Sequence, residues 1–254
     1  MFRTDFLKDT EDKKVISYLK GRCFVVEYLR DLSVSPQTAQ IALFMSEMNV
    51  HKKQLLIDLS KGPAVVQAGA MQWIVGRNSV KTDVKGAGDL ARKLVGSKAT
   101  GETAVKPKYE GNGWLVLEPT YRHLLICDMQ KSWSEGIVLE DGMFLACDAS
   151  IKQSVISRKN VSSALLGGEG MFNLTLSGSG MIVLESPVPR AELVEIQLEE
   201  DEVKIDGNYA VAWSPSLKFT VEKTTKSMIG SAASGEGFVN VYRGTGKVWM
   251  APIR

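Results

Sequence analysis

The chain has 254 residues, with 31 Lys and Arg against 29 Asp and Glu, which gives a formal net charge of +2 at pH 7. This near balance argues against a protein that binds nucleic acid or acidic membranes through overall charge. Hydrophobic content of 44% and charged content of 24% are ordinary for a soluble globular protein, and the length allows one large β domain.

Three cysteines, Cys23, Cys127 and Cys147, have no CxxC spacing, so neither a disulfide framework nor a zinc site is predicted. We expect buried free thiols in a reducing compartment. The first residues contain no apolar signal segment. The sequence therefore predicts a cytoplasmic protein.

Residues 1–53 predict a short strand and helix that cap the rest of the chain. Cys23–Leu29 has strand composition, and Ser35-Pro36 is typical of a helix start. Apolar residues then follow at i, i+3, i+4 and i+7, namely Ile41, Phe44, Met45 and Met48. We expect this stripe to pack against the β domain.

Residues 54–254 are predicted to form a single domain with an internal repeat. Gly-Glu pairs recur 67 residues apart, at Gly101-Glu102, Gly168-Glu169 and Gly235-Glu236. Gly-x-Gly triplets follow them, beginning at Gly111, Gly178 and Gly244, and each precedes an apolar run that ends in proline. The repeat predicts three units at about 54–119, 123–187 and 192–252.

Each unit predicts a β-hairpin that turns at its Gly-x-Gly triplet. In the middle unit Phe172, Leu174 and Leu176 alternate with polar residues, which indicates a strand with one buried face. Gly178–Gly180 tolerates the positive φ of a turn, and Met181–Leu184 returns as the second strand.

Further turns are predicted within the units. Gln54–Leu59 and Ala64–Val75 are strand-like, and Gly69 in the second run fits a turn or a bulge. Asp141-Gly142 and Asp206-Gly207 are each followed by an apolar strand and are typical of hairpin turns.

The predicted binding surface comes from three segments that interrupt the strands, at 86–97, 162–167 and 226–234. If the units match, these loops meet at one end of the molecule and gather apolar side chains that a monomer normally hides. The alternative is that the loops fold back onto the core. The side chains are Leu90, Leu94, Leu165, Leu166, Met228 and Ile229.

Glu102, Glu169 and Glu236 occupy equivalent positions in the repeat. One interpretation is structural, with each carboxylate accepting hydrogen bonds from backbone N–H groups of its Gly-rich turn. The alternative is a ring of carboxylates that recognises a cation or a basic partner segment.

No catalytic residue, metal site or cofactor is predicted. Cys127-Asp128 and Cys147-Asp148 have no histidine nearby in sequence, and two histidines, His51 and His123, are too few for a metal site. The Gly-x-Gly at 86–88 lacks the βαβ context of a dinucleotide site.

Charge is uneven along the chain. Residues 77–108 carry eight basic side chains, and residues 185–206 carry eight acidic ones. These stretches are either solvated faces or a basic and an acidic face that meet between subunits.

Three segments, 65–73, 165–172 and 244–249, resemble the altered-inheritance-of-mitochondria family of TRAP-like β proteins. The resemblance covers about residues 50–254. It implies an all-β, TRAP-like β-sandwich or coiled β architecture with pseudo-threefold character, related to the tryptophan RNA-binding attenuation protein, and a tendency to form homo-oligomers. It brings no catalytic residues.

Together these observations predict a non-enzymatic, oligomeric β scaffold or binding protein. Its loop end is expected to contact a protein partner or a membrane surface. The alternative function is an RNA- or nucleotide-binding regulator that uses the basic stretch 77–108.

Overall fold

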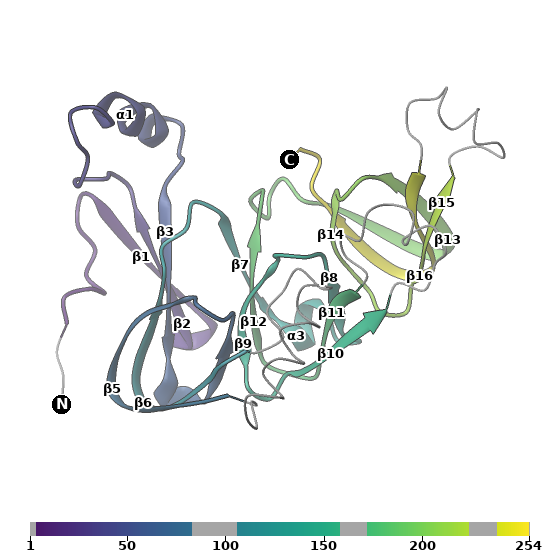
Figure 1. The fold of residues 1–254 in the computed structure, drawn as a ribbon, viewed down its shortest axis with the longest axis horizontal. Helices are drawn as coiled ribbons and strands as arrows, with labels where there is room; N and C mark the ends of the chain where they lie inside the picture. Colours follow the sequence, from purple (N-terminus) through teal and green to yellow (C-terminus); the bar gives the residue numbers. More distant parts are fainter. Residues whose placement is uncertain (1–3, 83–105, 158–171, 224–237, 254) are drawn as a thin grey trace, which may run out of the picture.

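The computed structural model describes residues 4–82, 106–157, 172–223 and 238–253. They form two antiparallel β-sheets (Figure 1), so the predicted all-β class is confirmed. The helices are α1 (Ala39–Glu47) and the one-turn α3 (Met129–Ser132), with 3-10 turns η1 (Leu19–Gly21) and η2 (Leu59–Lys61).

The first sheet contains nine of the described strands. Their order is β1 (Lys13–Tyr18), β2 (Cys23–Tyr28), β3 (Lys52–Asp58), β6 (Lys108–Leu117), β4 (Ala64–Val66), β9 (Phe144–Asp148), β12 (Met181–Ser186) and β7 (His123–Asp128), with β5 (Met71–Lys81) paired to β6. An isolated bridge between Lys53 and Thr120 brings the chain just before β7 back to β3. The sheet therefore curves around its own apolar face.

The second sheet contains seven of the described strands. Their order is β10 (Lys152–Ser157), β11 (Phe172–Ser177), β8 (Ile137–Leu139), β14 (Ala210–Trp213), β16 (Phe238–Met250) and β13 (Val194–Asp206), with β15 (Lys218–Lys223) paired to β16.

Strand β12 shows how the two cores are divided. Ile182 and Leu184 enter the core between the sheets, together with Leu176 and Trp249 of the second sheet. The alternate residues Met181 and Val183 enter the core enclosed by the first sheet. Because both faces of this central strand are covered, its sequence is a continuous apolar run.

The Gly-x-Gly triplets are not hairpin turns, so that prediction is wrong. Strand β16 runs from Phe238 to Met250 without reversing, and β6 runs through Gly111–Gly113. Gly178–Gly180 joins β11 of the second sheet to β12 of the first, and these two strands do not pair with each other.

In all three places the triplet lies where the chain changes its neighbouring strand. Before Gly111–Gly113, β6 pairs with β4, and after it with β3. Before Gly244–Gly246, β16 pairs with β15, and after it with β14. Positive φ at Gly111, Gly178 and Gly244 permits the bend.

Two related predictions are also corrected. Asp141-Gly142 and Asp206-Gly207 are turns with positive φ at the glycine, but the strands on either side of each turn pair with other strands. Strand β11 is buried on both faces, because Asn173 is also buried and its Nδ2 donates to the Leu139 carbonyl at 2.9 Å. The predicted strands themselves are present.

Residues before 54 extend the first sheet through the pairing of β2 with β3. Buried Arg22 fixes this region to the middle of the sheet. Its Nε donates to Oδ1 of Asp148 at 2.8 Å, and Oδ2 of Asp148 accepts from the Met181 N–H at 2.7 Å.

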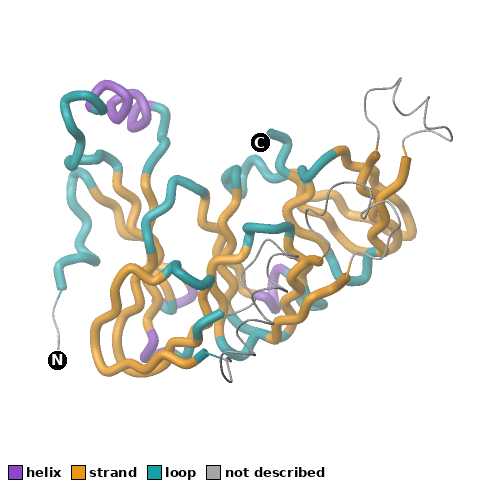
Figure 2. The backbone as a smooth tube through the Cα atoms, in the orientation of Figure 1, coloured by secondary structure: helices purple, strands orange, loops and turns teal. Residues whose placement is uncertain are grey.

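The predicted helix exists, but its apolar stripe does not pack against the β-strands. Figure 2 shows α1 standing beyond the strand ends of β2 and β3, joined to them by loops. Ile41 is 62% exposed, Phe44 59% and Met48 74%. The expectation of a buried packing face is therefore wrong for these three side chains.

Candidate functional site

The nine binding residues predicted from the sequence lie outside the described residues. They are Glu102, Glu169, Glu236, Leu90, Leu94, Leu165, Leu166, Met228 and Ile229. The acidic triplet and the loop patch stay predictions.

The three thiols are held away from solvent. Burial raises the pKa of Cys23 to about 12, of Cys127 to about 11 and of Cys147 to about 12. All three are free cysteines, as expected. At neutral pH they are protonated and therefore poor nucleophiles.

The two histidines lie in different surroundings. Nδ1 of His51 lies 3.2 Å from Oε1 of Glu27, while burial, assisted by Lys53, lowers the pKa of His123. Within the four described ranges, no three His, Cys, Asp or Glu side chains are grouped to hold a metal ion. No helix in the same ranges is long and apolar enough to cross a membrane.

The exposed stripe Ile41, Phe44 and Met48, called here the α1 face, is the most distinctive surface of the described chain. Helical spacing of i, i+3 and i+7 puts Ile41 and Phe44 of α1 and its C-cap residue Met48 on one side. Leu32 and Leu43 are also exposed. A soluble monomer rarely leaves so many large apolar side chains together in water.

The other side of α1 faces the strands. Ala42, Met45 and Ser46 border a small cleft that Tyr28 and Tyr121 also line. The Ser46 hydroxyl donates to the Leu29 carbonyl at 2.7 Å. The helix is thus attached through one side, and the α1 face is left outward.

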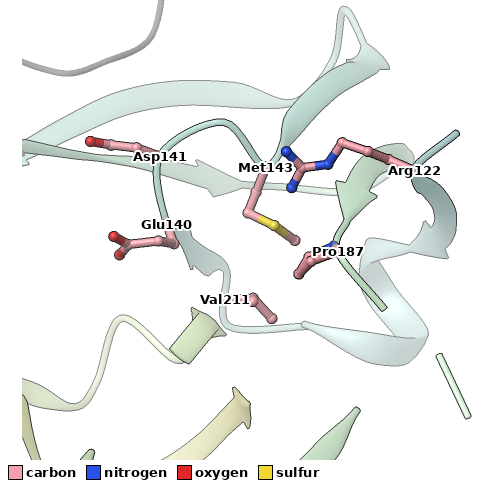
Figure 3. A pocket seen from close by; sticks show the side chains of 6 residues that line it. All are labelled: Arg122, Glu140, Asp141, Met143, Pro187 and Val211. Atoms are coloured by element: carbon pink, nitrogen blue, oxygen red, sulfur yellow. The ribbon is translucent and has the colours of Figure 1, made fainter. Parts of the chain in front are cut away.

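Two larger pockets between described residues have charged side chains in their linings. The first, of about 350 Å³, is lined by Arg122, Glu140, Asp141, Met143, Pro187 and Val211. Figure 3 shows the carboxylates of Glu140 and Asp141 pointing away from the Arg122 guanidinium. This pocket therefore does not gather charge of one sign around one point.

The second pocket, of about 440 Å³, lies where β7 meets β13 and β16. It combines an apolar wall with Lys131, Arg190, Glu195, Lys247 and Trp249. Sequence reasoning missed this site, because its charged residues are spread over about 120 positions and form no motif.

A family model described as Mitochondrial biogenesis AIM24 matches residues 47–253. The match starts at the last residue of α1, so β1, β2 and nearly all of α1 precede it. The second pocket lies within it, apart from Tyr18.

The chain is also similar to two streptococcal proteins. The uncharacterized protein M6_Spy0233 of Streptococcus pyogenes serotype M6 is 30% identical over 205 residues, which cover 78% of this chain and 80% of that protein. The crystal structure of protein SPYM3_0169 from Streptococcus pyogenes has a similar fold, with a TM-score of 0.58 at 24% identity, covering 81% of this chain and 89% of that chain. The family match spans most of the sequence, and this chain belongs to the Mitochondrial biogenesis AIM24 family.

Proposed function

We propose that this chain is a non-catalytic binding module that associates with a second copy of itself through the α1 face. The observation that carries the proposal is the exposure of Ile41, Phe44 and Met48, on a helix whose other side is already attached to the strands. Burial of these side chains would stabilise an assembly by the hydrophobic effect. Because α1 precedes nearly all of the family match, the proposal concerns this chain and not the family.

The composition of α1 favours a protein partner over a lipid surface. Helices that lie on membranes usually carry Lys and Arg on their polar side. The helix AQIALFMSE has neither, and its single charged residue is Glu47. An acidic membrane would repel Glu47 and would find no basic side chain on α1.

A second copy is the simplest partner with a matching surface. In a two-fold symmetric pair the same patch serves both subunits, so an apolar stripe meets its own equivalent. Side chains spaced three and four residues apart form the ridges by which helices pack on each other. The α1 face therefore has the pattern that self-association requires.

Light scattering coupled to size-exclusion chromatography tests this proposal. We expect the wild-type mass to exceed that of one chain at micromolar concentration. The double variant F44S/M48S should elute as a monomer, because two large apolar contacts per subunit are lost. The matched control is Val155→Ser, since Val155 is 55% exposed on β10, and it should assemble like the wild type.

A monomeric wild-type protein, or equal assembly of the wild type and F44S/M48S, would refute the proposal. A parallel flotation assay with acidic vesicles covers the membrane alternative. A monomeric protein that floats with vesicles through Phe44 and Met48 would replace self-association with lipid binding.

RNA or nucleotide binding through residues 77–108 stays the alternative prediction. Within the described part of this stretch, Lys81 forms an ion pair with Glu110, and Lys108 lies 3.4 Å from the same carboxylate. That carboxylate reduces the positive charge available to phosphates, so the structure adds no support for this alternative.

A further inference from the structure

The second pocket combines apolar side chains with cations that lie over aromatic rings. Its apolar lining comes from Tyr18 and from the edge strand β7. Leu125 and Cys127 of β7 point into the core between the sheets, which also contains Trp249, while Leu124 and Ile126 lie on the other face of the strand. The charged lining comes from α3, from the segment before β13, and from β13 and β16 of the second sheet. The cavity therefore has an apolar and a charged lining.

Two cations of the charged lining are fixed by aromatic rings. The Arg190 guanidinium lies 4.5 Å from the centre of the Trp249 ring. Nζ of Lys247 lies 4.4 Å from the centre of the Trp133 ring and 5.8 Å from that of Trp249. The two rings contact each other edge to face at 4.9 Å. Such cation–π contacts orient both charges without neutralising them.

Glu195 is the one carboxylate among the described residues that line the cavity. It accepts a hydrogen bond from Nε1 of Trp249 at 2.6 Å and lies 3.2 Å from Arg190 and 3.6 Å from Lys247. The Trp249 hydrogen bond and the two nearby cations lower the pKa of this carboxyl, so it is ionised at neutral pH. Its role is to position the indole and both cations.

The charges in the cavity do not cancel. Lys131 on α3 adds a third cation, so the lining contains three positive side chains and one carboxylate. A volume of about 440 Å³ lies within the usual range of small-molecule sites. We propose that this cavity binds a small anionic amphiphile, with its acidic head beside Lys131, Arg190 and Lys247 and its apolar body against Leu125 and Cys127. This site is independent of self-association through α1.

Tryptophan fluorescence provides the test, because Trp249 lines the cavity. The full chain is titrated with octyl phosphate below its micelle concentration, with octyltrimethylammonium and with inorganic phosphate. We expect saturable binding of octyl phosphate only, with affinity that falls as salt is added. The salt dependence is measured on the wild-type protein, so this part of the test does not depend on whether a variant folds.

Variants then locate the site. R190Q/K247Q should weaken octyl phosphate binding by about tenfold or more, because it removes both fixed cations. Lys152→Gln, on the exposed strand β10, removes one lysine elsewhere and should leave the affinity unchanged. Trp249→Phe should remove most of the fluorescence response.

Equal binding of the cationic amphiphile would overturn the proposal, since the cavity would then be selecting apolar chains alone. Inorganic phosphate that binds as tightly as octyl phosphate would overturn the role of the apolar wall. Absence of saturable binding, or an affinity that R190Q/K247Q leaves intact, would overturn the site itself.

Discussion

At the scale of single residues, Arg243 of β16 joins three strands of the second sheet. Its Nε donates to Oε2 of Glu202 on β13 at 2.6 Å, and its Nη2 donates to Oε2 of Glu222 on β15 at 2.9 Å. Hydrogen bonds from Arg243 and from Thr220 lower the pKa of Glu222 to about 2. The cluster is partly exposed, so its effect on stability is modest.

The lowered pKa of Glu222 predicts a pH dependence. The pKa of Glu222 is lower in the folded protein than the ordinary value of 4.5, so the ionised carboxylate stabilises the fold above about pH 4.5. This stabilisation is lost as the pH falls towards 2. Arg243→Gln should therefore lower the urea midpoint at pH 6, and its difference from wild type should shrink between about pH 4.5 and 2. Glu222→Gln, which removes the titrating group, is the control. A difference that stays constant down to pH 2 would contradict this prediction.

The burial of a residue could be predicted from the sequence where it depends on the neighbouring residues along the chain. Cysteines within apolar strands are buried free thiols, as expected, because neighbours along a central strand share its environment. Asn173 was not predictable in the same way. Its burial depends on the Leu139 carbonyl, 34 positions away, which satisfies its side-chain amide.

At the scale of elements, the three Gly-x-Gly triplets share a role that differs from the predicted one. The strand ranges were predictable, because apolar alternation and apolar runs report burial. The pairing of those strands was not, since a hairpin and a bent strand that changes neighbours need the same glycines. The three repeat units stay a prediction, although each Gly-x-Gly triplet lies where the chain changes its neighbouring strand.

Glycine at position 113 is required by strand packing. A Cβ atom there would lie 1.8 Å from the Val75 carbonyl oxygen of the paired strand β5. Gly113→Ala should therefore cost about 3 kcal/mol or more of stability, because a backbone atom cannot move aside. Gly69→Ala is the control: its φ of +81° is strained, but no atom lies within 4 Å, so we expect about 1–2 kcal/mol. Urea unfolding measures the stability of both variants. Equal losses of stability would show that the close approach of β5 and β6 is not the reason why position 113 requires glycine.

At the scale of the whole molecule, the proposed self-association depends on the orientation of α1. The sequence predicted the helix and its stripe, because side-chain spacing along a helix is a local property. It did not predict which side meets the strands, because the β2–α1 and α1–β3 loops set that orientation. Ala42, Met45 and Ser46 face inward, and the larger Phe44 and Met48 face solvent.

The α1 face lies at the start of the family match. Ile41 and Phe44 precede residues 47–253, and Met48 lies within them, as does all of the second pocket except Tyr18. The proposed assembly through α1 and the proposed ligand binding in the second pocket involve different residues, so separate variants test them. The cytoplasmic location expected from the sequence stays a prediction.

Cysteine cross-linking on α1 tests the central claim most directly, because it reports whether two helices face each other. The native thiols are buried, so an exposed cysteine introduced by Gln40→Cys is the reactive one. Under mild oxidation we predict that the Gln40→Cys protein forms a covalent dimer on a non-reducing gel, while the Val155→Cys protein on β10 stays monomeric. Equal dimer formation by the two variants, or none by Gln40→Cys, would contradict assembly through α1.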